Sequence, residues 1–108
     1  MTEDLQRLFA DVRDFGWNPN KRESNWRDHK IDFEDVKGVF DGYTFIRRSD
    51  RHGEVRYQIF GYVHGREVAV ACTLRGPLCW LISARPARRD ERRKFYDRLE
   101  GQPKPGQD

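Results

Sequence analysis

Glu54 and Arg56 stand two residues apart at the start of a segment with strand-like alternation, so both side chains are expected on one face of a sheet. Arg85 closes the last expected strand, and Arg75 marks a hairpin turn. A carboxylate among guanidinium groups suits metal-free chemistry on a phosphodiester. RNA carries its own nucleophile in the 2′-hydroxyl, so a base, a leaving-group acid and cations are sufficient. The spacing of Glu54 and Arg56 fits a simple edge ion pair equally well, worth about 0–1 kcal/mol if exposed.

A second set of polar residues follows one face of an expected helix. Lys21, Asn25 and His29 are spaced by four and form a stripe that drifts slowly around the axis. From spacing alone, helix capping and contact with solvent are the favoured interpretation of this stripe. The familiar motifs of nucleotide-binding loops, serine hydrolases and metalloproteases are absent, and no Cys/His cluster has metal-ligand spacing. The sequence therefore predicts neither a metal site nor a cofactor.

Composition narrows the class of protein. The 108 residues are 36% hydrophobic and 36% charged, but 13% are aromatic, which is enough to close one small core. Residues 1–46 carry 7 basic and 10 acidic side chains, whereas residues 47–98 carry 13 basic and 6 acidic, and 16 of the 21 basic residues are Arg. An Arg-rich half is typical of proteins that meet nucleic acid or an acidic partner. No long apolar run or basic leader is present, so we expect a cytoplasmic protein without a membrane partner.

The elements that must position these residues follow from periodicity. The first expected element is an amphipathic helix over 3–14, which Thr2 caps and Gly16 ends. A second helix is expected from Asn18-Pro19 to about His29, and Asp32 is expected to cap a third, short helix. Alternation then predicts four strands joined by a polar loop over Ser49–Gly53 and by turns at His64-Gly65 and Arg75-Gly76-Pro77; the strands are Tyr43–Arg48, Val55–Val63, Glu67–Thr73 and Leu78–Ala84. A basic helix over Arg88–Leu99 closes the chain.

The predicted fold class is α+β, with N-terminal helices, an antiparallel meander of three or four strands, and a basic C-terminal helix. Residues 1–14 are expected to form an appendage, residues 15–99 the main domain, and residues 100–108 a disordered tail. Cys72 and Cys79 flank the last turn, where a hairpin centred between Arg75 and Gly76 would set them opposite each other. Two buried free thiols are the favoured interpretation over a disulfide.

Several blocks, taken together and in order, resemble the BrnT family of type II toxins. The match begins with Trp17-Asn18-Pro19-Asn20-Lys21, Asn25, His29 and Phe33-Glu34-Asp35; it continues with Val39-Phe40-Asp41, Asp50 to Arg56 and Thr73-Leu74-Arg75-Gly76; it ends with Ile82 to Ala87, Glu91-Arg92 and Tyr96. The blocks span residues 15–98. Leu74 departs from the pattern, since the family commonly has Glu there.

The resemblance implies an RNA-cleaving toxin with a RelE-like fold of the RelE/ParE-like superfamily. It also implies a cognate BrnA-like antitoxin with a ribbon-helix-helix domain, through which alone the toxin would meet operator DNA. Carried over by position, the catalytic candidates are Lys21, Glu54, Arg56 and Arg85, with His29 and Arg75 as weaker ones. Glu54, or less favourably His29, would accept the proton; Arg56 and Arg85 would hold the scissile phosphate; Lys21 would neutralise developing charge.

The preferred prediction is therefore a metal-independent endoribonuclease that cleaves mRNA and inhibits translation. Two alternatives stay open: a non-catalytic module that acts as corepressor in a toxin–antitoxin–DNA complex, and, by fold analogy alone, a DNA-gyrase poison. Further arginines are expected to bind the RNA backbone; they are Arg75, Arg88, Arg89, Arg92 and Arg93. The four in the C-terminal helix could equally receive an acidic antitoxin segment, and the two uses are compatible.

Overall fold

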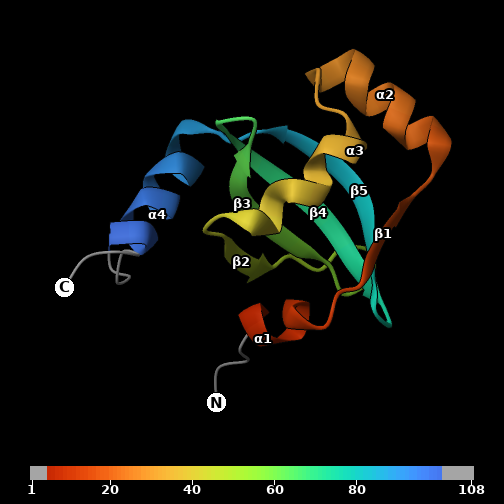
Figure 1. The fold of residues 1–108 in the computed structure, drawn as a ribbon, viewed down its shortest axis with the longest axis horizontal. Coiled ribbons are helices and arrows are strands. Elements are labelled where there is room, and N and C mark those ends of the chain that lie inside the picture. The colour runs from red at the N-terminus through yellow and green to blue at the C-terminus, as the bar shows by residue number, and fades with distance from the viewer. Residues whose placement is uncertain (1–4, 101–108) are drawn as a thin grey trace.

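A computed structural model describes residues 5–100 as an α+β fold built on one five-stranded mixed sheet (Figure 1). The strands are β1 (Asp14–Trp17), β2 (Phe45–Arg48), β3 (Tyr57–Val63), β4 (Arg66–Arg75) and β5 (Leu78–Pro86). The helices are α1 (Leu5–Ala10), α2 (Pro19–His29), α3 (Phe33–Val36) and α4 (Arg89–Glu100), with a 3-10 helix, η1 (Lys37–Asp41), directly after α3. The α+β class is confirmed. The expected cap at Thr2 and all of the expected tail except Glu100 lie outside the described residues.

The sheet differs from the expected antiparallel meander at its edge. Strands β2 to β5 are antiparallel in chain order, but β1 lies beyond β5 and runs parallel to it. The helix expected over 3–14 was therefore predicted too long, since α1 ends at Ala10 and Asp14 begins a strand. Gly16 permits the close pairing: a Cβ there would lie 3.0 Å from the Trp80 ring. This pairing is long-range, so periodicity along the chain could not predict it.

Helix α2 follows its sequence signals at both ends. The Asn18 side chain accepts a hydrogen bond from the amide of Asn20 at 2.8 Å, and Pro19 occupies the first turn. The helix ends at His29, and Lys30 after it caps the helix in the left-handed conformation with φ 57°. Asp32 then caps α3 by accepting from the amide of Glu34 at 3.1 Å. The predicted positions of α2 and of the α3 cap are confirmed.

Two tight hairpins set the register of the central strands. His52-Gly53 and His64-Gly65 both have positive φ at each residue, as two-residue hairpin turns of the mirror-image type require. The turn at His64-Gly65 is the predicted one. The expected polar loop over Ser49–Gly53 is more regular than predicted, because Arg51 and Glu54 exchange both backbone hydrogen bonds, at 3.0 and 2.8 Å. The β2–β3 hairpin thus extends beyond its strands.

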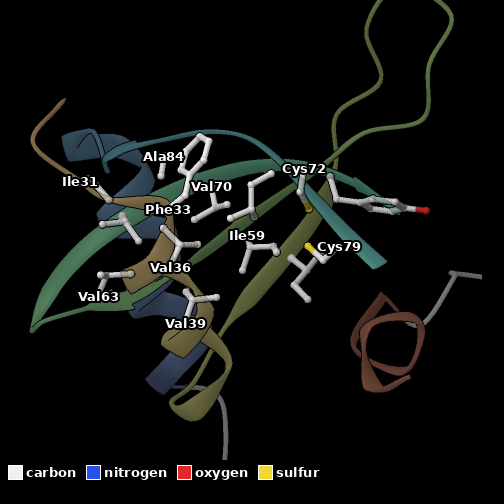
Figure 2. Close-up of a cluster of buried hydrophobic side chains, with 14 of the residues drawn as sticks. Ile31, Phe33, Val36, Val39, Ile59, Val63, Val70, Cys72, Cys79 and Ala84 are labelled. Carbon is white, nitrogen blue, oxygen red and sulfur yellow. The ribbon is translucent and has the colours of Figure 1, made fainter. Parts of the chain in front are cut away.

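The main core lies between one face of the sheet and helices α1 and α3 with η1 (Figures 1 and 2). Phe33 and Val36 of α3 and Val39 of η1 are buried against Ile59 and Val70. Cys72 and Cys79 also lie in this core as free thiols, as the sequence favoured. They are not directly opposite each other, because Cys79 pairs with Leu74 and Cys72 with Leu81.

Helix α4 packs on the other face of the sheet. Its Phe95 is buried against Phe60 and Ala69, with Tyr43 and Tyr62 in contact with the ring. Figure 1 shows α4 leaving the end of β5 apart from the other helices. The basic C-terminal helix is confirmed. None of the helices within residues 5–100 is long and apolar enough to span a membrane.

Candidate active site

On the sheet face that carries α4, a row of four paired residues crosses strands β2 to β5, and three of the four are polar. Arg47 of β2 pairs with Gln58, Gln58 with Ala71, and Ala71 with Ser83 of β5. The ladder is irregular after Ala71, and this leaves Ile82 and Ser83 together between the buried Leu81 and Ala84. Ala71 has only a methyl group at the centre of the row. The centre of this face is therefore lower than its flanks.

Over this row lies a cavity of about 490 Å³ that is rich in cations. Ala71, Ile82 and Ser83 contribute to its lining, together with Ser49, Tyr57 and Gln58. Five arginines and one lysine also line it, and one carboxylate accompanies them; these charged residues are Lys21, Arg47, Arg51, Arg56, Arg85, Arg88 and Glu91. They come from α2, β2, the β2–β3 hairpin, β5 and the start of α4. Converging cations of this kind attract an anionic ligand such as a phosphodiester.

Arg56 and Glu54 are paired beside this cavity. Nε of Arg56 donates to Oε1 of Glu54 at 2.7 Å, and the two side chains are 27% and 43% exposed. Arg56 lines the cavity, whereas Glu54 is not among the lining residues but contacts this guanidinium. The hairpin positions both residues, because the amide of Ser49 bonds to the Arg56 carbonyl at 2.7 Å. The expected strand start at Val55 falls two residues early, since β3 begins at Tyr57.

Arg85 is held by a buried carboxylate that the sequence analysis did not single out as functional. Glu91 is 4% exposed and accepts from Nη1 and Nη2 of Arg85 at 2.7 and 2.9 Å. It also accepts from the amide of Arg88 at 2.8 Å, as an acidic residue in the first turn of a helix does in a capping box. The hydrogen bonds from Arg85 lower the pKa of Glu91 to about 2 and raise the pKa of Arg85, although burial acts in the opposite direction on both groups. The pair is therefore charged at neutral pH.

Arg47 and Arg51 are further cavity cations that sequence reasoning missed. Nε of Arg47 donates to Gln58 at 2.8 Å, its guanidinium lies over the Phe60 ring, and its Nη2 is 3.8 Å from Glu91. The available signal was alternation: Arg47 follows Ile46, so it had to point away from the core. Only the register across β2 to β5 and the position of Glu91 at the start of α4 place it beside the Arg85–Glu91 pair.

Lys21 reaches the cavity because α2 is anchored to β5. Asn25, one turn further on, is buried and bonds to both the amide and the carbonyl of Ala84 at 2.9 Å. It also donates to the carbonyl of Ile31 at 2.9 Å. The residues of the α2 stripe therefore have different roles, since Lys21 lines the cavity and Asn25 attaches the helix to β5. His29 ends α2, about 12 Å along the helix axis from Lys21, and is not among the cavity residues.

Residues 17–91 match the model of a protein family described as ribonuclease toxin, BrnT, of type II toxin-antitoxin system. The chain belongs to the BrnT family. It is also similar to the 1.1 Å crystal structure of the Brucella abortus ribonuclease toxin, BrnT, with a TM-score of 0.55 and 24% sequence identity; the match covers 70% of this chain and 97% of that chain. At that identity the structural match shows a shared fold. No curated protein sequence matches the chain. As a BrnT-family ribonuclease toxin of a type II system, it has RNA as substrate and an antitoxin as partner.

The remaining arginines predicted for this BrnT-family chain are spread more widely. Arg88 lines the cavity, but Arg89 and Arg93 are exposed on α4. Arg92 donates to the carbonyl of Ala87 at 2.9 Å and so stabilises the start of the helix. Arg75 lies at the end of β4, with its guanidinium 4.3 Å from the centroid of the Trp80 ring, and is not among the cavity residues.

Proposed function

We propose that this chain is a metal-independent endoribonuclease that cleaves mRNA in the cytoplasm and thereby inhibits translation. The observation that carries the proposal is the convergence of Arg56 and Arg85 on one cavity with Lys21. Arg56 comes from the β2–β3 hairpin and Arg85 from β5, and each is paired with a carboxylate. Guanidinium groups fixed in this way can hold the two non-bridging oxygens of a phosphodiester as negative charge grows on them.

The proposed reaction uses the nucleophile of the RNA itself. The 2′-hydroxyl attacks the adjacent phosphorus, its proton passes to a base, and the 5′ oxygen of the next nucleotide leaves and takes up a proton. The products are a 2′,3′-cyclic phosphate and a 5′-hydroxyl. Arg56 and Arg85 stabilise the pentacoordinate phosphorane charge, and Lys21 neutralises charge on the leaving oxygen.

We assign the proton acceptor to Glu54. The competing carboxylate, Glu91, accepts three hydrogen bonds and has a pKa lowered to about 2, so it is a poor base and acts by positioning Arg85. His29 lies at the far end of α2, about 12 Å along the helix axis from Lys21, whereas Glu54 bonds directly to a residue that lines the cavity. Glu54 contacts Arg56 directly and is 43% exposed, which leaves its carboxylate accessible to a bound nucleotide.

The proposed partner is a BrnA-like antitoxin with a ribbon-helix-helix domain, and operator DNA would be bound through that antitoxin. An acidic antitoxin segment in the cavity would compete directly with the RNA phosphates, because both ligands need the same cations. The antitoxin would then neutralise the toxin by occupying the site that binds the RNA substrate.

Purified protein tests the proposal directly. Single-stranded RNA is incubated with the chain in the presence of EDTA, and the new ends are analysed for 2′,3′-cyclic phosphate. We expect cleavage by the parent, and a loss of about 10²–10³-fold in kcat/KM for Arg56→Ala and Arg85→Ala. Arg13→Ala, which removes an exposed cation that does not line the cavity, is the matched control. Intact RNA after incubation with the parent would refute the nuclease and leave the corepressor role.

A further inference from the structure

A second cavity, of about 530 Å³, lies on the other flank of α2 and has no part in the proposed reaction. Its lining is dominated by rings, from Trp17, Trp26 and Pro19. Trp26 is 52% exposed, which is unusual for the largest apolar side chain in a small protein. Trp17 is fixed by an edge contact with Phe33, at 5.9 Å between ring centroids. The groove thus combines one rigid indole with one accessible indole.

The charged residues in and around this groove largely offset one another, and two lysines lie over its indole rings. Nζ of Lys30 lies 5.5 Å from the centroid of the Trp26 ring. Nζ of Lys37 lies 5.3 Å from the centroid of the Trp17 ring and is also paired with Glu34 at 3.0 Å. Arg22 and Asp32 also line the groove but neutralise each other through two bonds of 2.7 and 3.0 Å. Aromatic faces flanked by cations are the platform on which proteins stack the bases of single-stranded RNA.

The groove and the catalytic cavity both border helix α2. Lys21 lines the catalytic cavity and Arg22, the next residue of α2, lines the groove. Asn25 binds β5 between them, so the two cavities are separated by no more than the width of one helix, about 10–12 Å. We infer that the groove is a base-binding subsite, in which Trp26 stacks on an unpaired nucleobase that flanks the scissile linkage of single-stranded RNA. This inference rests on the proposed function, because the proposed cleavage is what places an RNA strand in the catalytic cavity beside the groove.

Hydrogen-bonding groups in the groove would select among bases. Glu23 lines it, and its carboxylate can accept from an exocyclic amino group or a ring N–H. Stacking on Trp26 provides affinity for any base, whereas the edge contact with Glu23 favours a base that presents donors. The subsite would thus contribute to the choice of cleavage position.

Binding of an uncleavable RNA tests the subsite separately from catalysis. A fluorescein-labelled, fully 2′-O-methylated RNA of about ten nucleotides is titrated with protein, and anisotropy reports Kd. Loss of one stacked base should raise Kd roughly 5- to 100-fold in Trp26→Ala, while Trp26→Phe stays near the parent. Leu8→Ala, which removes an exposed apolar side chain from α1, is the control and should not change Kd. Circular dichroism verifies that each variant is folded.

The outcomes separate the two proposals. A parent that binds this RNA through Trp26 but does not cleave the unmodified RNA supports the subsite and refutes the nuclease. A Kd for Trp26→Ala within about twofold of the parent overturns the subsite, whether or not the parent cleaves RNA. If Trp26→Ala binds RNA normally but is no longer neutralised by its co-expressed antitoxin, the groove is a protein-docking site and the inference is wrong.

Discussion

Arg85 and Glu91 form a bidentate ion pair that joins the end of β5 to the first turn of α4. Glu91 is 4% exposed and also accepts from the Arg88 amide, so one buried carboxylate caps a helix and orients a cavity cation. Both carboxylate oxygens bind Arg85, and the guanidinium therefore cannot rotate away from the cavity. This relationship predicts that catalysis and stability depend together on Glu91.

Glu91→Gln should lower both the stability and the activity of the protein. The neutral amide leaves Arg85 without its charged partner, and breaking a mostly buried pair costs about 3 kcal/mol in free energy of unfolding. A displaced guanidinium should reduce kcat/KM roughly 100-fold. Urea denaturation and RNA cleavage measure the two effects. Glu91→Asp, which keeps the charge on a shorter side chain, should recover part of both, and equal losses in Asp and Gln variants would contradict this role.

The same pair predicts how stability depends on pH. The folded pKa of Glu91 is about 2, below its usual value near 4.5, so the folded state favours the ionised form. Its contribution is complete above about pH 4.5 and is lost as the pH falls toward 2. The difference in free energy of unfolding between parent and Glu91→Gln should therefore shrink over that interval. Denaturation curves at pH 7, 4.5 and 2.5 measure it; a difference that does not change with pH would show that Glu91 is not ionised in the folded state.

Local signals were sufficient for much of the fold. Asn18 and Asp32 are side chains that cap helices by bonding two residues ahead, so they predicted the starts of α2 and α3 correctly. His64-Gly65 predicted its hairpin for a similar reason, because positive φ is favourable for Gly. Strand β1 was missed because its four residues form a strand only through long-range pairing with β5.

The site was only partly predictable, for a related reason. Arg56 and Arg85 were recognised through their place at strand ends and through family resemblance. Arg47 and Glu91 were not, since their importance depends on strand register and on the docking of α4. Alternation could have placed Arg47 on the polar face of the sheet, and the position of Glu91 three residues after Arg88 could have indicated a capping role.

Asn25→Ala should reveal a structural role for the middle of the α2 stripe. The side chain makes three buried bonds to backbone groups, and their loss leaves the amide of Ala84 and two carbonyls unpaired. We expect a decrease of about 2–4 kcal/mol in free energy of unfolding, but near-normal cleavage at low temperature, because Asn25 does not line the cavity. Ser24→Ala is the neighbouring control. A stable but inactive Asn25→Ala protein would instead place Asn25 in the chemistry.

Gly61→Ala should destabilise the core without touching the cavity. Gly61 lies in the middle of β3, and a Cβ there would be 2.8 Å from Cγ2 of Val39 and 3.3 Å from Cγ2 of Thr44. Overpacking of this kind costs about 1–3 kcal/mol, because η1 must move away from the sheet. The double variant Gly61→Ala/Val39→Ala removes the closer contact and should recover part of the loss beyond the sum of the single effects. Additive effects would contradict the proposed contact.

The salt dependence of RNA binding should distinguish the cavity cations from the rest of the basic surface. Each phosphate contact with single-stranded RNA contributes about 0.7 to the slope of log K against log salt concentration. We expect Arg88→Ala to reduce the slope by about that amount, since Arg88 lines the cavity. Arg93→Ala tests the exposed part of α4 and should give a similar reduction if the strand follows this helix, as the sequence predicted. Arg13→Ala controls for net charge. An unchanged slope for Arg93→Ala would limit the RNA path to the cavity and leave the outer cations of α4 to the antitoxin. A salt titration of the parent that is flat would exclude binding to the RNA backbone altogether.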